Sequence, residues 1–263
     1  ASYYAGRAYV YLGGSDGLAT SPASTLEGNG YFGMSVASAG DVNGDGYADV
    51  VVGAPFANLS EGRTFIYFGG AEGLRTGSVS VLENPVPLGP HDVMGTVFVW
   101  NENFGRSVAS AGDVNGDGYA DIVVGSSEES RRAYVFLGAP GGVAPHPTTS
   151  LANPLDEDPF GRSVAGAGDV NGDGYADIIV GSPGFRGTAH AFVYLGAASG
   201  IPTVAAATLA GPVGGPLDNG YTGFGEAVAG AGDVNGDGYA DVILGASTLN
   251  LLRGYALIYV GGA

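Results

Sequence analysis

The sequence predicts an all-β protein made of repeated sheets, and three observations lead to that prediction. One unit occurs four times, beginning with Phe-Gly at Phe32, Phe104, Phe160 and Phe224 and reaching the first Asp of an identical turn nine residues later. Each unit continues into a β-branched, apolar run such as Val50-Val51-Val52, which is typical of a strand. Fifty Gly, few charged residues and two Met fit a chain rich in turns, without the 3.6-residue periodicity of helices.

Each repeat is predicted to contain four short strands, called A to D in chain order. In the first repeat they cover Phe32–Ala39, Ala48–Gly53, Thr64–Phe68 and Val79–Leu82. The B strand is a continuous apolar run, suited to burial on both faces. Further C strands are expected at Ala133–Leu137, Ala191–Leu195 and Ala256–Val260, and further D strands at Thr148–Leu151 and Ala206–Leu209.

The spacing of the repeats indicates the blades of a β-propeller. The first Asp of the turn recurs after 72, 56 and 64 residues, which suits four-stranded antiparallel blades. A lone blade cannot cover its apolar B strand, so neighbouring blades must pack face to face around an axis. We therefore expect a single propeller domain over residues 1–263, with repeat cores that start near residues 32, 104, 160 and 224.

The first 28 residues complete or begin a further blade. They contain a C-like strand, Ala8–Leu12, and a D-like strand, Ser24–Glu27, while the chain ends on another C-like strand. This is one strand more than four closed blades need. We favour a ring closed by pairing the N-terminal strands with the last blade, because propellers leave only short, protected edges. A longer parent chain, a smaller ring and two chains that complete one another stay open.

The turn between strands A and B predicts calcium binding. It reads Asp-Val-Asn-Gly-Asp-Gly-Tyr-Ala-Asp in all four repeats, with oxygen side chains at positions 1, 3, 5 and 9, a Tyr carbonyl at 7 and a turn-permitting Gly at 6. Without a cation, three carboxylates in so short a turn would repel one another. A helix-loop-helix site carries its acid at position 12, where these loops have Val or Leu, so a strand-to-strand loop is expected instead. The predicted ligands of about four Ca²⁺ ions are Asp41, Asn43, Asp45, Tyr47, Asp49, Asp113, Asn115, Asp117, Tyr119, Asp121, Asp169, Asn171, Asp173, Tyr175, Asp177, Asp233, Asn235, Asp237, Tyr239 and Asp241.

Composition limits the partners and the compartment. The net charge of −17 argues against nucleic acid and anionic membranes, and four Ca²⁺, with eight positive charges, would bring it to −9. No apolar run approaches the length of a membrane helix, and Ala1–Tyr4 has no basic region of a signal peptide. The absence of Cys leaves the redox compartment open. Loops of this kind fill where calcium is millimolar, so an extracellular, cell-surface or periplasmic location is expected.

One edge of the predicted sheets is constant and the other is variable. Successive turns of an antiparallel sheet alternate ends, so the constant A–B and C–D connections share one edge. The B–C and D–A connections share the other edge and differ in length; the D–A connections have 4, 20, 7 and 13 residues. Variable loops on a rigid scaffold commonly bind ligands. The candidate ligand-binding residues there are Trp100, His91, Arg131 and Arg186. The alternative for the 84–103 insertion, which holds Trp100, is a loop that packs its own apolar residues onto the blade.

No catalytic constellation is found, so the chain is not expected to be an enzyme. It lacks the G-x-S-x-G, Walker and dinucleotide-binding motifs, and its three His residues show no metal-ligand spacing. Acidic runs at Glu128-Glu129 and Asp156-Glu157-Asp158 could in principle supply the paired carboxylates of a glycosidase. Adjacent acids in one loop are far more often a solvated surface.

The Phe-Gly start, the Asp-rich turn and the closing Gly53-Ala54-Pro55 resemble FG-GAP repeats over nearly the whole chain. These repeats build the propeller of integrin alpha subunits and related secreted propellers, some of them lectins. The resemblance implies calcium at the matching Asp, Asn and Tyr positions on the lower rim and a partner on the opposite face. In the later repeats the closing triplet differs from Gly-Ala-Pro and reads Gly-Ser-Ser, Gly-Ser-Pro and Gly-Ala-Ser.

The preferred hypothesis is a secreted, calcium-stabilised propeller that acts as a non-catalytic binding or adhesion module for a protein or carbohydrate ligand. One alternative is a structural module that assembles with another chain, as a homo-oligomer or within a larger parent. Another is the accessory domain of a secreted enzyme.

Overall fold

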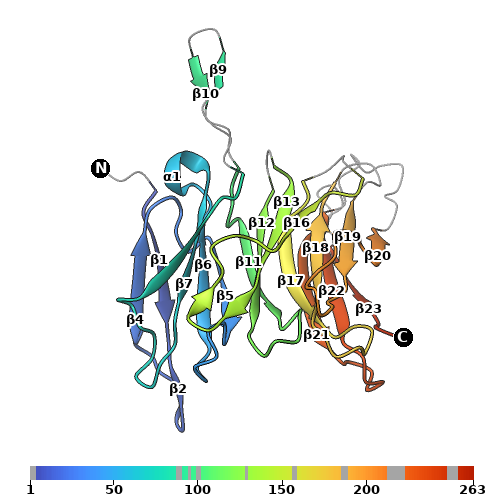
Figure 1. Cartoon of the computed structure of the whole chain (residues 1–263), viewed down its shortest axis with the longest axis horizontal. Coiled ribbons are helices and arrows are strands. Elements are labelled where there is room, and N and C mark those ends of the chain that lie inside the picture. The colour runs from blue at the N-terminus through green and yellow to red at the C-terminus, as the bar shows by residue number, and fades with distance from the viewer. Residues whose placement is uncertain are drawn as a thin grey trace.

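A computed structural model of the chain describes residues 4–86, 91–93, 96–98, 102–127, 130–155, 159–184, 189–211, 223–247 and 254–263. The described part consists almost wholly of antiparallel sheets, arranged one after another along the chain (Figure 1). The prediction of an all-β protein built from four-stranded blades is confirmed.

Three sheets contain the four predicted strands in the order A-B-C-D. The first is β5 (Ser35–Gly40), β6 (Asp49–Ala54), β7 (Arg63–Tyr67) and β8 (Val79–Glu83). The second is β11 (Ser107–Gly112), β12 (Asp121–Ser126), β13 (Arg132–Phe136) and β16 (Thr149–Ala152). The third is β17 (Ser163–Gly168), β18 (Asp177–Ser182), β19 (His190–Tyr194) and β20 (Ala207–Ala210). Strands B to D lie within one residue of their predicted positions, whereas the first A strand begins at Ser35 because Phe-Gly forms a turn in which Gly33 has φ +85°.

The two end units are smaller. The first pairs β1 (Gly6–Val10) with β4 (Ser24–Gly28), and the last has three strands, β21 (Phe224–Gly232), β22 (Asp241–Ala246) and β23 (Tyr255–Tyr259). The connections between the main strands contain small elements that the sequence did not predict. They are the two-stranded pairs β2 (Gly13–Gly14) with β3 (Gly17–Leu18), β9 (His91–Val93) with β10 (Thr96–Phe98) and β14 (Gly138–Ala139) with β15 (Gly142–Val143), and a single turn, α1 (Ala57–Ser60).

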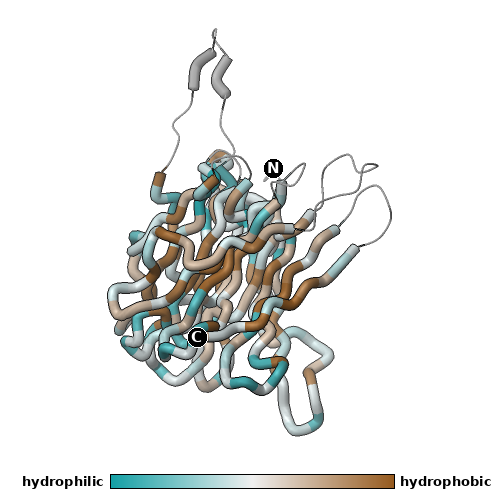
Figure 2. Tube along the Cα trace, turned by 90° about the vertical axis from the view of Figure 1, so that its right-hand side faces the viewer, coloured by the Kyte–Doolittle hydropathy of each residue, from teal (hydrophilic) through white to brown (hydrophobic). Residues whose placement is uncertain are grey.

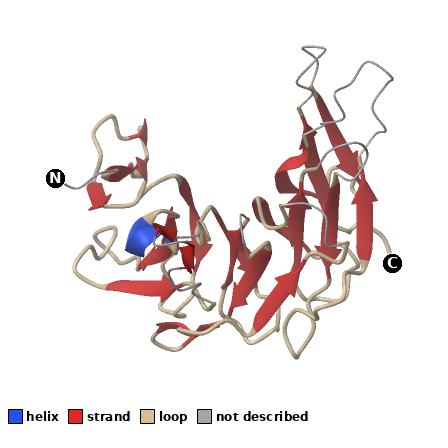
Figure 3. Cartoon of the chain, turned by 90° about the horizontal axis from the view of Figure 1, so that it is seen from above, coloured by secondary structure: helices blue, strands red, loops and turns tan. Residues whose placement is uncertain are grey.

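The sheets stand along an arc, with the two chain ends at its opposite ends (Figure 3). The A strands β5, β11, β17 and β21 pack in that order, each against the A strand of the next sheet. Apolar residues follow the strands, and hydrophilic residues gather in the turns at the lower edge (Figure 2). This is the face-to-face stacking expected of propeller blades.

The core lies between the sheets rather than within any one of them. One apolar cluster combines Val51 and Ile66 of the first full sheet with Phe104, Ile122 and Phe136 of the second. Equivalent clusters join the second sheet to the third, the third to the last unit, and β4 to the first full sheet. Each blade therefore depends on its neighbours for the burial of its B strand.

The predicted ring closure is wrong for this structure. Among the described residues β1 pairs only with β4 and β23 pairs only with β22, so no ladder in this part of the chain connects the first unit to the last. β4, a D-type strand that could pair with the outer edge of β23, is instead paired with β1 and packs on the first full sheet, on the opposite side of the molecule from β23 (Figure 1).

Exposure at the ends of the arc reflects this open arrangement. Val36 on the first full sheet is 57% exposed, whereas the equivalent Val108 and Val164 are 6% and 5% exposed. At the other end Val234 is 53% exposed, although its counterparts Val42 and Val114 are fully buried. Both contrasts arise because the position that a neighbouring blade would occupy is not filled.

The closing Gly of the B strand in the first three repeats is required by the close approach of the next blade. Gly125 at the end of β12 faces the backbone of Gly161, and a Cβ at Gly125 would collide with the Gly161 carbonyl. Gly53 and Gly181 meet Gly105 and Gly225 in the same way. The Phe-Gly start of one repeat thus interlocks with the Gly that closes the repeat before it.

Gly125→Ala should lower the free energy of unfolding by about 3 kcal/mol, since the clash involves backbone that cannot move aside easily. Gly77→Ala, at a site with open space, is the matched control and should change stability by less than about 0.5 kcal/mol. Urea unfolding followed by circular dichroism measures both. Equal effects for the two variants would show that the blades do not pack as described.

Candidate metal-binding loops and the variable edge

The four Asp-rich loops connect strands A and B at the same edge of each sheet. In every copy the Gly residues at positions 4 and 6 adopt positive φ; Gly116 and Gly118 in the second loop have φ +75° and +90°. Residues with a Cβ rarely adopt this conformation, so the loop shape depends on Gly at these two positions. The expected sharp turn at position 6 is confirmed.

The Asp at position 1 organises the loop around its carboxylate. In the second loop Asp113 Oδ1 accepts hydrogen bonds from the backbone N–H of Gly116 at 2.7 Å and of Asp117 at 3.1 Å. Its Oδ2 accepts from the N–H of Gly118 at 2.8 Å. The same three bonds recur in the other loops, so in all four the backbone folds around the carboxylate at position 1.

The Asp at position 9 is buried and ties the loop to strand C. Asp121 Oδ2 accepts from Val114 N–H at 2.8 Å, and Oδ1 accepts from Gly138 N–H, also at 2.8 Å. Gly138 follows strand C, so one carboxylate joins both connections at this edge. Asp49, Asp177 and Asp241 make the same two bonds, and all four carboxylates are buried.

Burial disfavours the charged form of Asp49, Asp121 and Asp177 and raises the pKa of each. Desolvation raises the pKa of Asp121 to about 6, although its two backbone hydrogen bonds oppose the shift, and the nearby carboxylates of Asp117 and Asp113 raise it further. The same causes raise the pKa of Asp177 to about 6 and that of Asp49 above its usual range. In contrast, backbone N–H donors, Gly238 first, lower the pKa of the exposed Asp233.

The donor set of the loops fits a hard cation. Within the described residues no cluster of three His, Asp or Glu side chains has the geometry of a metal site, because the carboxylates face the loop's own N–H groups. A carboxylate has about four acceptor positions, so each retains capacity after two or three such bonds. Three carboxylates, an Asn amide oxygen and a backbone carbonyl are the oxygen ligands that Ca²⁺ prefers.

The loops of neighbouring blades are linked through their backbones. Ala120 N–H in the second loop donates to the Asp41 carbonyl in the first at 2.9 Å, and the next two pairs repeat this bond at 3.0 and 2.9 Å. The ring of Tyr119 lies close to Gly44 in the preceding loop, leaving no room for a side chain there. The carbonyl that accepts each bond belongs to a predicted ligand residue, so the shape of one loop is coupled to that of the next.

The candidate ligand-binding residues of the opposite edge are only partly described. Arg131 is exposed in the B–C connection of the second sheet, with φ +47°. His91 begins β9, but its side chain lies outside the described part, as do Trp100 and Arg186 entirely. Whether these four residues form one surface therefore stays a prediction, and the acidic runs at Glu128-Glu129 and 156–158 also lie outside the described residues.

Sequence reasoning missed four side chains that the fold brings to one place. Met34, Arg106, Arg162 and Glu226 follow the Phe-Gly of successive repeats and together line a hollow of about 320 Å³. They are separated by 72, 56 and 64 residues in the chain, so only the alignment of the repeats places them together. One sequence signal could have identified them: the residue after Phe-Gly differs between the repeats, although the residues on either side of it are nearly constant.

Comparison with known families identifies the repeats. A model described as FG-GAP-like repeat matches residues 1–52 and 113–180, and one described as FG-GAP repeat matches residues 32–82 and 224–256. The chain belongs to the FG-GAP repeat family, and its sheets are FG-GAP propeller blades.

Curated relatives include integrin alpha subunits. The chain is 32% identical to integrin alpha-7 of Rattus norvegicus over 96% of its own length and 21% of the relative's. It is 36% identical to integrin alpha-IIb of Mus musculus over 59% of its length and 15% of that protein. The chain thus spans about a fifth or less of the length of these relatives.

A solved structure, AofleA from Arthrobotrys oligospora, aligns with a TM-score of 0.47 and 14% identity, covering 91% of this chain and 59% of that one. Among the described residues, no helix has the length and apolar character needed to cross a membrane.

Without calcium, the protein should become more stable as the pH falls from 7 to 5. The folded-state pKa of Asp121 and of Asp177 is about 6, above the value of 3.8 in an unfolded chain, so the folded state binds more protons in this window. The pKa of Asp233 is lowered, so this carboxylate titrates below pH 5 and does not contribute to the change between pH 7 and 5. Melting temperatures measured in metal-stripped buffer at the two pH values test this.

The double variant Asp121→Asn with Asp177→Asn is the control, and it should flatten the dependence because neither amide titrates. A melting temperature that falls as metal-free protein is acidified to pH 5 would contradict the burial described for these carboxylates.

Proposed function

We propose that this protein is a calcium-stabilised extracellular propeller that acts as a non-catalytic binding module for a protein or carbohydrate ligand. The Asp-rich loops hold the ions at one edge, and the variable loops at the opposite edge meet the ligand. The integrin relatives support an extracellular location and a binding role, since the matched segment is a repeat domain and not a catalytic one.

One observation carries the calcium assignment. Each loop places three carboxylates in nine residues, one of them buried, with little positive charge to balance them. Among the described residues, one loop carboxylate forms an ion pair: Asp45 lies 3.2 Å from the guanidinium of Arg75. In this part of the chain the carboxylates of the other three loops form no ion pair with an Arg side chain. Buried carboxylates are generally paired or coordinate a metal, so a divalent cation would supply the missing charge.

The chemistry expected of the ion is structural. Ca²⁺ bound to oxygen ligands would offset the repulsion among the three carboxylates of a loop and stabilise the folded state by mass action. The chain's own residues supply the rest. The position 9 carboxylate fastens the A–B loop to the end of strand C, and the backbone bonds between loops fasten one blade to the next.

Chelation should lower the melting temperature by about 10 °C or more, because ions bound only to the folded state stabilise it by several kcal/mol at saturation. Differential scanning fluorimetry with chelator, with added Ca²⁺ and with Mg²⁺ measures the effect. Calcium should restore the original value and magnesium should restore less. A melting curve that is the same under all three conditions would exclude the calcium assignment.

Asp117→Ala should weaken the calcium dependence of stability, whereas Glu72→Ala should not. Asp117 is a position 5 carboxylate of the second loop, and Glu72 is an exposed acid that serves as a control of equal charge change. We expect Asp117→Ala to lose about 2 kcal/mol in saturating calcium and much less in chelator. Chemical unfolding under both conditions measures this. Identical losses for the two variants would mean that loop carboxylates are not ligands.

The binding role is tested on the variable edge. Replacing residues 84–103 by the four residues 28–31, the shortest D–A connection of the same chain, removes the longest variable loop and leaves the calcium loops unchanged. A glycan array and a panel of extracellular matrix proteins, each probed with calcium present, should show binding by the wild type that this variant loses. Binding that the loop replacement leaves intact would place the ligand elsewhere.

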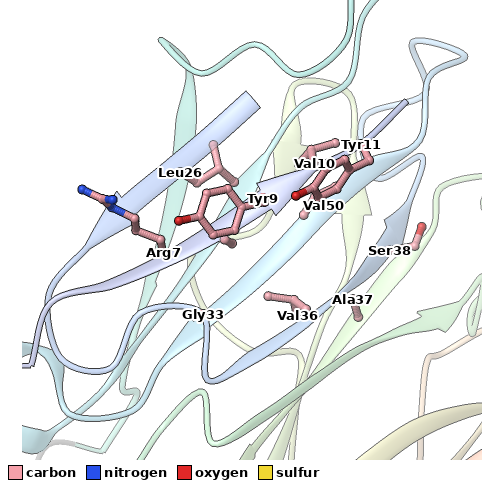
Figure 4. Close-up of a pocket in the computed structure, with 11 residues that line it drawn as sticks. Arg7, Tyr9, Val10, Tyr11, Leu26, Gly33, Val36, Ala37, Ser38 and Val50 are labelled. Carbon is pink, nitrogen blue, oxygen red and sulfur yellow. The ribbon is translucent and has the colours of Figure 1, made fainter. Parts of the chain in front are cut away.

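A second candidate function, assembly with another polypeptide, is favoured by the free edge of β1. In each complete blade the equivalent C strand pairs with a buried B strand on this edge, but within the described residues β1 pairs only with β4. A cavity of about 650 Å³ lies there, lined by residues that include Tyr9, Tyr11 and Val36 (Figure 4). An extended apolar segment would complete the sheet at this position.

Sedimentation equilibrium separates the two candidates. Assembly between copies predicts a mass that is a multiple of 26.1 kDa and that Tyr9→Glu reduces to a single chain. A mass of 26.1 kDa at every concentration, in a protein that still binds its ligand, would leave the binding module as the sole role.

A further inference from the structure

The hollow lined by Met34, Arg106, Arg162 and Glu226 lies at the variable edge, where the A strands begin. The four residues occupy the same position in successive repeats, directly after Phe-Gly. Because the A strands of adjacent blades pack against one another, these positions are brought together around one hollow. The hollow is therefore built by four blades jointly.

The backbone holds these side chains in a common orientation. The N–H of Met34 donates to Tyr31 O at 3.0 Å, that of Arg106 to Asn103 O at 2.9 Å, and that of Glu226 to Gly223 O at 3.1 Å. The same three-residue turn thus precedes residues of different chemistry in three of the four repeats. A turn of this kind fixes the direction in which each side chain leaves the backbone.

The side-chain contacts connect the first repeat to the second and the third to the fourth. Arg106 Nη1 lies 3.7 Å from Met34 Sδ, a weak acceptor, and Arg162 Nη2 lies 3.9 Å from Glu226 Oε1. Glu226 Oε2 accepts a hydrogen bond from Ser247 Oγ at 2.8 Å. Both Arg side chains are partly exposed, so their guanidinium groups are within reach of a solute in the hollow.

The local charge is opposite to that of the whole molecule. The chain carries a net charge of −17, and its nine basic residues are all Arg. Two of the nine face this hollow together with a single carboxylate, which gives it a formal charge of +1. Paired guanidinium groups favour a carboxylate, which each can bind with two parallel hydrogen bonds.

We propose that this hollow binds a carboxylated sugar, such as a uronic acid residue of a glycan. The assignment rests on the proposed function and specifies its ligand. Arg106 and Arg162 would bind the carboxylate, Glu226 would accept hydrogen bonds from ring hydroxyls, and Met34 would contact the apolar face of the ring. The volume of about 320 Å³ suits one ring-sized group, and the Glu beside the Arg pair favours a ligand that carries hydroxyl donors as well as a carboxylate.

Trigalacturonate, its methyl ester and triglutamate are the probes, and titration calorimetry in calcium-containing buffer is the measurement. Trigalacturonate should bind, and its affinity should fall as salt is raised. The methyl ester, in which the carboxylates are neutralised, should bind about tenfold more weakly or not at all. Arg106→Gln with Arg162→Gln should also weaken trigalacturonate binding about tenfold or more.

Arg132→Gln, on β13 and outside the hollow, removes one positive charge from another part of the molecule and is the control that should bind as the wild type does. Equal binding of acid and ester, or no effect of the double variant, would overturn the proposal. Tighter, Arg-dependent binding of triglutamate would assign the hollow to an acidic protein instead. Calcium-dependent melting of the same double variant tests the proposed function separately, since it should match the wild type whichever ligand the hollow binds.

Discussion

Each sheet of this propeller buries its B strand only against the sheets on either side. The apolar clusters all straddle two neighbouring sheets, and Gly125 meets the Gly161 backbone so closely that no side chain fits between them. This mutual dependence explains the regularity of the repeat. A residue that departs from the pattern in one blade disturbs the packing of two, so the Phe-Gly start, the closing Gly and the B strand have little freedom to vary.

The Asp-rich loops extend the same dependence to one edge of the arc. The position 9 carboxylate joins the A–B loop to strand C within a blade, and the Ala120 N–H to Asp41 carbonyl bond joins one blade to the next. Burial and the neighbouring carboxylates raise the pKa of Asp121 to about 6. The fold thus gathers carboxylates at a place where their charged forms destabilise one another. A cation bound in each of the four loops would offset this repulsion.

The sequence predicted the local structure well, because the information it needed is local. Alternation and β-branched runs located strands B to D of the four repeats within one residue and the N-terminal C strand, β1, within two, and the Gly at position 6 predicted the turn. The ring closure was predicted wrongly, because it depends on how far the stacked sheets curve, which the residues of a single repeat do not specify: β4 pairs with β1 on one side of the molecule, and β23 lies on the other (Figure 1). Met34, Arg106, Arg162 and Glu226 were missed because they are distant in the chain, and only the packing of the A strands places them around one hollow.

The two edges of the blades therefore have different roles in this account. The constant edge uses one residue pattern four times to stabilise the scaffold, while the opposite edge uses equivalent backbone positions to present different side chains. The most direct test of the central claim is a count of calcium bound per chain, by equilibrium dialysis with elemental analysis of protein purified without chelator. The account predicts four ions for the wild type and three for Asp117→Ala. A wild type that holds no calcium at millimolar free ion, or a variant that holds as many ions as the wild type, would contradict it.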